Sequence, residues 1–331
     1  MSPEGVTRVA AIDCGTNSLR LLVADVDPAA GCLSDVDRRL EIVRLGQGVD
    51  ATGRLAADAL ARTLRVLRSY QRIIEEASAS AIRMVATSAT RDAVNAGEFV
   101  AGVRDILAIE PEVLSGEEEA RLSFIGATAE FAAARPGVPD PPPGHLGPPY
   151  LVVDIGGGST EFVLGAGWPG AAGPEAALSV DIGCVRMTER HLHTNPPRPD
   201  EISAATADID AALDQVAAKV PVASARTLIG LAGSVTTVAG IALGLPAYDP
   251  ARIHLARIPA RQVHEIARDL LGQAYQQRAR IPVMHPGRVD VIGAGALVLD
   301  RVLARFGFAE AVASEHDILD GMAWSMVTDG R

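Results

Sequence analysis

The feature that most constrains the fold is a short pattern that occurs once in each half of the chain. The segment from Ile12 to Ser18 reads IDCGTNS, and the segment from Val153 to Ser159 reads VDIGGGS. In both, an apolar run ends in an aspartate, a glycine follows two residues later and a serine five residues later. We interpret the two copies as products of a duplication, which predicts two related units. Their turns would face one cleft and bring two aspartates together.

Around these turns, apolar runs alternate between strand-like and helix-like periods, which is typical of an α/β protein. In the first half we predict strands at 7–12, 19–26, 39–45 and 82–86, and helices at 56–77, 98–108 and 116–134. In the second half we predict strands at 150–154, 161–164 and 177–181, and helices at 198–219, 233–243, 260–273 and 288–306. The proline-rich stretch 136–149 cannot continue a helix and is expected to form a surface loop.

Composition limits the partners of such a protein. The chain has 331 residues, of which 48% are hydrophobic, so it can build two sizeable cores at about 150 residues per domain. A net charge of −11 and 4% aromatic residues argue against a surface that coats nucleic acid or polyphosphate by bulk charge. An anionic ligand must therefore be captured locally.

Cysteine usage and the N-terminus predict a cytoplasmic protein. The three cysteines are far apart and form no CxxC pair, which argues against a disulfide framework and against a zinc site. No secretory signal is recognisable at the N-terminus. The uncharged segment 228–247 contains several glycines, a serine and two threonines, so we do not expect it to span a membrane.

The glycine-rich turn from Asp154 to Thr160 predicts phosphate chemistry. Because glycines leave the backbone bare, several N–H groups can converge on phosphate oxygens, and Ser and Thr hydroxyls add donors. The aspartate can hold a hydrated Mg²⁺. Either turn alone is better explained by a plain β-hairpin, but two copies in register favour a phosphate site. The sequence contains no GxxxxGK[ST] and no GxGxxG, so P-loop and dinucleotide-binding folds have no support.

Four blocks carry a resemblance to a known family. They are 12–18 (IDCGTNS), 86–91 (ATSATR), 115–122 (SGEEEARL) and 154–161 (DIGGGSTE), followed by GLAGS at 230–234 and SEHDILDG at 314–321. Together they resemble the actin, sugar-kinase and heat-shock-chaperone ATPase superfamily and, within it, the exopolyphosphatase and guanosine pentaphosphate phosphohydrolase (Ppx/GppA) family. The resemblance covers almost the whole chain.

The resemblance implies an α/β fold of two ribonuclease-H-like, actin-like domains hinged around a central cleft. Domain I would comprise 1–125 and 313–331, and domain II would comprise 126–312. Larger members of the family add helical C-terminal domains, which this chain is too short to contain. We therefore expect a preference for short polyphosphate chains.

Site residues follow from the resemblance position by position. Glu119 is similar to the catalytic base of the family, and Glu161 is expected beside the metal and the attacking water. Asp154, Glu161 and Asp13 would hold the metal, taken to be Mg²⁺ or another divalent cation. Arg91 resembles a phosphate-binding arginine. The remaining phosphate-binding residues would be Asn17, Ser18, Gly156, Gly157, Gly158, Ser159 and Thr160.

Physical reasoning limits how many glutamates of the acidic run from Glu117 to Glu119 can serve one site. Successive residues of a helix point about 100° apart, so one glutamate at most can face a given point, and we expect the other two to be solvated. A partly buried carboxylate among others should have a raised pKa, which suits a base that takes a proton from water. Outside its block, the run would be better explained as a solvated helix N-terminus.

The sequence therefore predicts a Mg²⁺-dependent exopolyphosphatase that releases orthophosphate from the end of polyphosphate. A pppGpp 5′-phosphohydrolase is the alternative, and a nucleotide-binding switch, a kinase or a nucleotide-sensing pseudoenzyme has less support. A homodimer is expected from the resemblance. His191 and His193 lack a third ligand of suitable spacing, and the other histidines are scattered along the chain. We expect Cys14 to be a small buried residue without a nucleophilic role.

Overall fold

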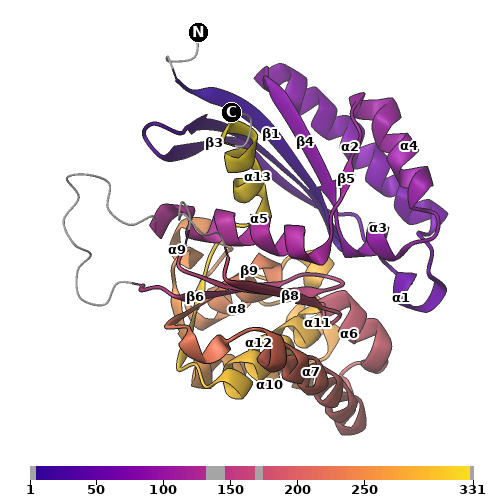
Figure 1. The fold of residues 1–331 in the computed structure, drawn as a ribbon. Helices are drawn as coiled ribbons and strands as arrows, with labels where there is room; N and C mark the ends of the chain where they lie inside the picture. The colour runs from indigo at the N-terminus through magenta and orange to yellow at the C-terminus, as the bar shows by residue number, and fades with distance from the viewer. Residues whose placement is uncertain (1–4, 132–145, 168–173, 329–331) are drawn as a thin grey trace. The chain divides into compact units, whose positions relative to one another are not determined.

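The computed structural model describes residues 5–131, 146–167 and 174–328. Contacts divide the chain into two units (Figure 1). Unit 1 comprises Met1–Gly126 and Ile318–Arg331, and unit 2 comprises Ala127–Asp317. The domain boundaries expected after residues 125 and 312 stay a prediction.

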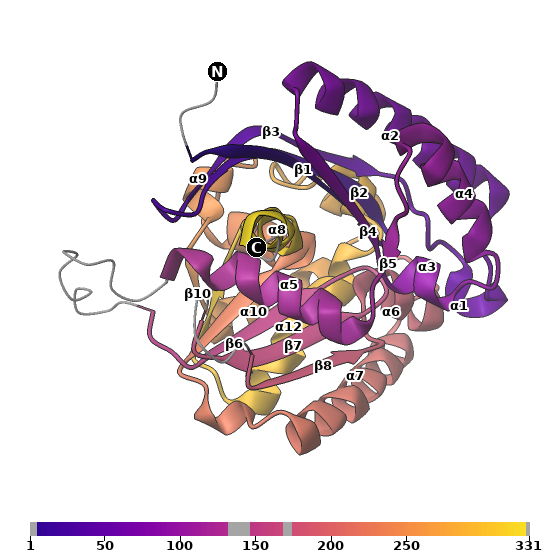
Figure 2. The same ribbon diagram turned by 45° about the horizontal axis from the view of Figure 1, so that its top comes forward.

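Unit 1 is built on a five-stranded sheet of order β3-β2-β1-β4-β5. Strand β1 pairs antiparallel with β2 and parallel with β4, so a hairpin meander is followed by a crossover. Helices α2 and α4 pack together on one side of the sheet, and α13 packs on β1 and β2 from the other (Figure 2). The strands are β1 (Thr7–Cys14), β2 (Ser18–Asp27), β3 (Cys32–Ile42), β4 (Ala81–Ala86) and β5 (Glu112–Val113).

The helices of unit 1 follow the expected apolar stripes. Leu67, Tyr70 and Ile74 of α2 are buried on one face, in the same core as Phe99 and Val103 of α4. Ser115 precedes α5 and caps it, because its Oγ accepts the amide of Glu118 at 3.2 Å. The helices are α1 (Val49–Thr52), α2 (Ala57–Ala77), α3 (Ser88–Asp92), α4 (Ala96–Leu107), α5 (Gly116–Thr128), which begins in unit 1, and α13 (Ile318–Thr328).

Unit 2 repeats this plan. Its six-stranded sheet has the order β10-β11-β9-β6-β7-β8, in which β8-β7-β6-β9-β11 follows the same path as the five strands of unit 1. Again the first three strands form an antiparallel meander, and the fourth is parallel to the first. The strands are β6 (Tyr150–Ile155), β7 (Thr160–Gly165), β8 (Ala176–Val180), β9 (Thr227–Leu231), β10 (Arg257–Pro259) and β11 (Glu310–Ala313).

Small residues let the helices of unit 2 pack closely. A Cβ on Gly295 of α12 would lie 2.1 Å from the hydroxyl of Ser234 in α8, so only glycine allows this approach. Helix α12 also packs on α6, α7 and α10. The helices are α6 (Cys184–His191), α7 (Pro199–Lys219), α8 (Ala232–Ala242), α9 (Pro250–Ile253), α10 (Ala260–Gly272), α11 (Tyr275–Arg278) and α12 (Ile292–Phe306), with 3₁₀ turns η1 (Ala129–Phe131), η2 (Val222–Ser224) and η3 (Pro286–Arg288).

The structure confirms the α/β class and the two ribonuclease-H-like units. The third strand was predicted wrongly at 39–45, because β3 begins at Cys32, where its polar edge sequence gives no apolar alternation. The predicted helix 116–134 ends as α5 at Thr128, and residues 132–134 lie outside the described residues. So does most of the predicted proline-rich loop.

Most of the uncharged segment 228–247 is buried in unit 2. It forms most of β9, which is fully buried, and the whole of α8, of whose eleven residues seven are buried, whereas Leu243 beyond α8 is exposed. Across the described ranges, no helix has the length and apolar character to cross a membrane. The sequence analysis did not predict α6, β9, β11 or α13, whose apolar runs are short.

Candidate active site

The two predicted turns have the same geometry. In unit 1 the amide of Gly15 donates to the carbonyl oxygen of Ser18 at 3.0 Å, and in unit 2 the amide of Gly156 donates to that of Ser159 at 3.0 Å. Asp13 is paired in register with Arg20 on the neighbouring strand, and Asp154 is paired with Glu161. Glu161 therefore occupies in the second turn the position that Arg20 occupies in the first.

In unit 1 the aspartate is neutralised by its neighbour. Arg20 donates to Oδ2 of Asp13 from Nη2 at 2.6 Å and from Nε at 3.0 Å. Both side chains are largely buried, so the guanidinium compensates a charge that would otherwise be costly. A carboxylate that already holds a cationic partner is a weaker candidate for a metal ligand.

In unit 2 the corresponding pair is two carboxylates. Asp154 is 7% exposed and Glu161 is 1% exposed, on adjacent strands and opposite each other. Ser179 of β8 donates a hydrogen bond of 2.7 Å to Oε1 of Glu161, which orients that carboxylate. Two buried like charges repel, and a shared cation removes the repulsion. Carboxylate oxygens are the ligands that Mg²⁺ prefers, so this pair fits the predicted metal.

Helix α6 fixes the glycine-rich turn of unit 2. The amides of Cys184 and Val185 donate to the carbonyl oxygens of Gly156 and Gly157 at 2.9 and 2.8 Å. A side chain at Gly183 could not fit, since its Cβ would lie 2.3 Å from the Gly157 oxygen.

The same contacts determine where the amides of the turn point. Arg186 donates from Nε to the carbonyl oxygen of Gly158 at 2.7 Å, so a third carbonyl of the turn has a partner in α6. In a trans peptide the N–H points opposite to the C=O. The amides of Gly157, Gly158 and Ser159 are therefore directed away from these α6 donors, as a phosphate-binding turn requires.

Unit 1 holds the predicted base. Glu119 is 9% exposed, whereas Glu117 is exposed to solvent. Glu118 is not simply solvated as expected, because Arg121 grips both of its oxygens at 2.8 and 2.9 Å. The hydrogen bond from Arg121 lowers the pKa of Glu118 and outweighs its partial burial. Of the three glutamates, Glu119 alone is buried.

The predicted phosphate-binding arginine lies beside this base. Nη1 of Arg91 is 3.3 Å from Oε2 of Glu119 and donates to the carbonyl oxygen of Leu114 at 2.9 Å. This contact places a positive charge beside the buried carboxylate. Arg91 is still 27% exposed at its side chain, so part of the guanidinium remains accessible.

The first two blocks of unit 1 are also joined. The hydroxyls of Thr16 and Ser88 are 2.8 Å apart, so the first turn contacts the start of α3. The carbonyl oxygen of Asn17 accepts the amides of Val43 and Arg44, which anchors the residue by its backbone. Unit 1 therefore gathers three of the four blocks, and unit 2 contains the fourth.

Sequence reasoning missed two arginines of unit 2. Arg186 donates a hydrogen bond to the turn at Gly158, as described above. The guanidinium of Arg288 lies over Gly233 in the GLAGS segment, where a Cβ would be 2.1 Å from its Cζ. Neither arginine stands in a recognisable block. In the sequence, the glycine at position 233 in GLAGS was a signal for the close approach that the structure shows.

His191 of the HxH pattern has a carboxylate partner, because its Nε2 lies 2.8 Å from Oδ2 of Asp208. His254 and His316 were expected to be scattered, but they lie together with Glu130. Cys14 is buried, and burial raises the pKa of its thiol, which agrees with the expected structural role.

Known proteins were compared with the whole chain. Exopolyphosphatase 2 of Mycobacterium tuberculosis is 47% identical over 97% of this chain and 99% of its own length. A bifunctional 3-dehydroquinate synthase/phosphatase of Fusobacterium nucleatum is 32% identical over 94% of this chain and 45% of its own length.

Solved structures of similar proteins have the same fold over nearly the whole chain. An exopolyphosphatase-like protein, 40% identical, superposes with a TM-score of 0.88 over 98% of both chains. A Ppx/GppA protein of Aquifex aeolicus, 28% identical, has a TM-score of 0.77 over 98% of this chain and 99% of that chain. The model of the Ppx/GppA phosphatase family matches residues 22–329, so the expected class of hydrolase is confirmed at the level of the family. This chain belongs to the Ppx/GppA phosphatase family.

Proposed function

We propose that this protein is a Mg²⁺-dependent exopolyphosphatase that hydrolyses the terminal phosphate of inorganic polyphosphate and releases orthophosphate. The observation that carries the proposal is the buried pair Asp154 and Glu161, opposite each other at the base of a turn whose amides are oriented for phosphate. The name of the Mycobacterium tuberculosis relative, Exopolyphosphatase 2, supports the choice of substrate.

The proposed reaction uses the residues of both units. The amides of Gly157, Gly158 and Ser159, with the hydroxyls of Ser18 and Ser159, hold the oxygens of the terminal phosphate. Thr160 shapes the turn instead, because its buried hydroxyl donates to the carbonyl oxygen of Ile182 at 3.1 Å. Asn17 contributes its carboxamide and Gly156 shapes the turn. Arg91 can bind two phosphate oxygens through its planar guanidinium.

The metal is held by Asp154 and Glu161, with Asp13 as a further candidate ligand. When bound, Mg²⁺ neutralises charge that develops on the phosphate oxygens. Glu119 orients a water molecule and takes its proton as the water attacks in line. Phosphoryl transfer to water needs positioning and charge neutralisation more than covalent chemistry, which this set of residues can supply.

Substitution of the base tests the proposal directly. Glu119→Gln keeps the shape of the side chain but cannot accept a proton, so we expect turnover to fall about 100-fold to 10,000-fold while polyphosphate binding persists. Glu117→Gln is the matched control, because Glu117 is an exposed residue of the same acidic run and its substitution should leave turnover unchanged. Orthophosphate release from polyphosphate, with and without Mg²⁺, measures both. Equal turnover in the Glu119→Gln variant and the wild-type protein would remove Glu119 from this role.

The second candidate substrate is pppGpp. The family description includes GppA, and removal of the 5′ γ-phosphate of pppGpp has the same chemistry, with a phosphate as leaving group. Orthophosphate release from pppGpp and polyphosphate in parallel decides between them. ATP-dependent phosphorylation of a sugar without orthophosphate release would instead indicate a kinase.

Assembly and location complete the proposal. We expect a homodimer in the cytoplasm, with polyphosphate as the partner in catalysis and no nucleic acid or membrane bound. Light scattering of the purified protein measures the mass, and a monomer across micromolar concentrations would contradict the dimer.

A further inference from the structure

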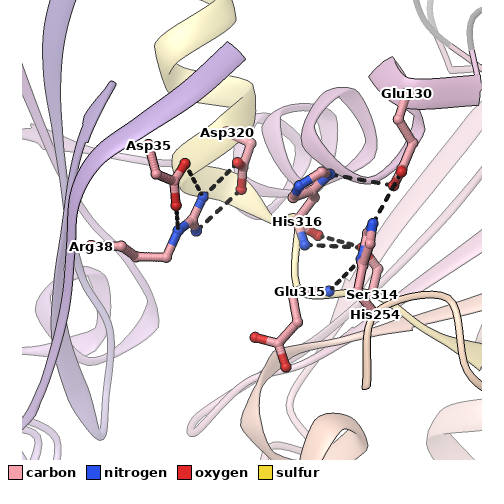
Figure 3. A network of polar contacts seen from close by, with 8 residues as sticks. All are labelled: Asp35, Arg38, Glu130, His254, Ser314, Glu315, His316 and Asp320. Carbon is pink, nitrogen blue, oxygen red and sulfur yellow. Dashed lines mark hydrogen bonds and ion pairs between the residues drawn. The ribbon is translucent and has the colours of Figure 1, made fainter. Parts of the chain in front are cut away.

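Unit 2 gathers two histidines and a glutamate outside the glycine-rich turn, and one of the histidines, His316, belongs to the SEHDILDG segment at 314–321. Glu130 lies in η1, His254 follows α9, and His316 lies between β11 and α13 (Figure 3). One ligand atom from each side chain lies within 4.8 Å of the others. The three residues are far apart in the sequence, so only the fold brings them together.

The carboxylate of Glu130 bridges the two imidazole rings. Its Oε2 is 3.0 Å from Nε2 of His254, and its Oε1 is 3.3 Å from Nδ1 of His316. The ring centroids are 4.4 Å apart. The side chains are 21–40% exposed, so solvent and ions can reach them.

The surrounding loop holds His316 in place. The hydroxyl of Ser314 donates to the carbonyl oxygen of His316 and accepts its amide, both at 3.0 Å. The carboxylate of Glu315 is directed elsewhere, to the hydroxyl of Tyr248 at 2.7 Å. The cluster therefore has a defined set of two ring nitrogens and one carboxylate.

Two imidazole nitrogens and one carboxylate oxygen form a known donor set for zinc in open, four-coordinate sites, where water takes the fourth position. Ligand atoms around one tetrahedral Zn²⁺ are separated by about 3.3 Å when each bond is about 2.0–2.1 Å long. The two nitrogen-to-oxygen distances in the cluster are close to this spacing, but they involve different oxygens of the Glu130 carboxylate. One atom from each residue lies within 4.8 Å of the others, so a bound cation would draw the three groups slightly closer together. We propose that Glu130, His254 and His316 bind one Zn²⁺ or a transition cation of similar size.

The positions of the ring protons determine which hydrogen bonds a bound cation would replace. The amide of Glu315 donates to Nδ1 of His254 at 3.2 Å, so neutral His254 carries its proton on Nε2 and donates it to Glu130. A cation on Nε2 requires that proton to move to Nδ1, and the amide of Glu315 then loses its acceptor. This hydrogen bond and those from the two rings to Glu130 are given up in exchange for three bonds to the metal.

The charge of Glu130 favours the binding of a cation. Burial opposes its charge, but the hydrogen bonds from His254 and His316 outweigh burial and lower its pKa to about 2. The carboxylate is therefore an anion at neutral pH.

The position in the chain suggests a structural role for the ion. Glu130 follows the first connection between the units, and His316 precedes the second, since unit 2 comprises Ala127–Asp317. A shared cation would cross-link the two segments through which the chain enters and leaves unit 2. These ligands are different residues from Asp154 and Glu161, so the proposal is independent of the proposed Mg²⁺ site.

Co²⁺ substitution tests the site. We expect full-length protein stripped with a chelator to bind one equivalent of Co²⁺ with the visible absorption of a four-coordinate, nitrogen-bound ion, and Zn²⁺ to displace it and raise the melting temperature. His254→Gln and His316→Gln should each lose this absorption and weaken Zn²⁺ binding at least about 100-fold. His264→Gln is the matched control, because His264 is an exposed histidine of the same unit that pairs with Asp300.

A further variant separates this site from the proposed active site. Asp154→Asn with Glu161→Gln should keep the Co²⁺ absorption, and loss of the absorption there would overturn the proposal. So would wild-type protein without such absorption, or an unchanged spectrum in both histidine variants. If those variants do not fold, ¹⁵N spectra of the histidine rings in wild-type protein decide, since Zn²⁺ must shift the nitrogens of His254 and His316 in particular.

Discussion

At the residue scale, the two halves of the protein differ most at one pair of positions. The strand register aligns Asp13 with Arg20 and Asp154 with Glu161, so a cation in unit 1 is replaced by a carboxylate in unit 2. The first pair compensates its own charge, whereas the second pair places two carboxylates opposite each other, which fits the proposed metal site. The same backbone therefore carries an ion pair in unit 1 and the proposed metal ligands in unit 2.

Substitutions should separate these roles. We expect Glu161→Gln to raise the Mg²⁺ concentration for half-maximal activity at least about tenfold with little change in melting temperature. Asp13→Asn should instead destabilise the protein by about 2–4 kcal/mol, because it leaves the largely buried Arg20 without a charged partner. Mg²⁺ titrations of activity and thermal unfolding measure both effects. The reverse pattern would make Asp13 the principal metal ligand.

At the element scale, each unit depends on helices that approach the sheet or each other closely. In unit 1, α13 contacts β1 and β2 and also packs against α5. Gly321 permits the second contact, because a Cβ there would lie 1.9 Å from the carbonyl oxygen of Leu122. Backbone atoms cannot move aside as a flexible side chain can, so this glycine is required.

Gly321→Ala should therefore destabilise unit 1 by at least about 2 kcal/mol. Gly97→Ala is the matched control, because it is also a helical glycine of unit 1, but with open space around it. Alanine there should be neutral or stabilise α4 by up to about 1 kcal/mol. Urea unfolding monitored by circular dichroism gives both values. Equal stability of the two variants would show that α5 and α13 are not in close contact.

The β1–β2 hairpin predicts a pH dependence. Arg8 donates to both oxygens of Asp25 at 2.7 and 2.8 Å, and this hydrogen bond lowers the pKa of Asp25 below its ordinary 3.8. A lowered folded-state pKa stabilises the protein above the unfolded value, and the stabilisation is lost as the pH falls from about 3.8 through the folded value.

Asp25→Asn should thus lower the melting temperature slightly at pH 7 and have no effect at a pH below both values. Asp58→Asn is the control, because Asp58 is more exposed than Asp25 and its contact with Arg62 is longer, at 3.7 Å. Melting curves from about pH 2 to neutral pH test this. A difference that grows towards low pH would contradict the sign.

Much of the local structure was predictable from sequence. The strands at 150–154 and 161–164 and the long helices α2 and α7 were located to within a residue or two, because their apolar periods are long and regular. The edge strand β3 was not, since an exposed strand needs no apolar alternation. The sequence blocks also singled out Glu119 and Asp154 as candidate site residues. They did not predict the ion pairs that Arg20 and Arg91 form.

At the scale of the whole molecule, unit 1 is discontinuous in the chain. It is completed by α13, which returns to it after the segment Ala127–Asp317. Unit 2 is continuous and carries both the proposed metal pair and the cluster of Glu130, His254 and His316. Unit 1 therefore requires the C-terminal helix α13 to be complete, whereas unit 2 ends before that helix.

Truncation after Asp317 tests this dependence. Loss of α13 uncovers one side of β1 and β2, so we expect amide hydrogen exchange in these strands to accelerate by orders of magnitude. Peptides from β6 and β9 should keep their protection. Exchange measured by mass spectrometry compares the truncated and full-length proteins, and unchanged protection in β1 would show that unit 1 does not require α13.

The sequence by itself determined the alternation of strands and helices, the duplicated turns and the family, because these are written in local periodicity and contiguous blocks. Tertiary structure decided which charges meet. Arg20 neutralises Asp13, Arg91 contacts Glu119, and Glu130 joins two histidines from distant segments. Such pairs depend on strand register and on how helices cross, and neither leaves a fixed spacing in the sequence.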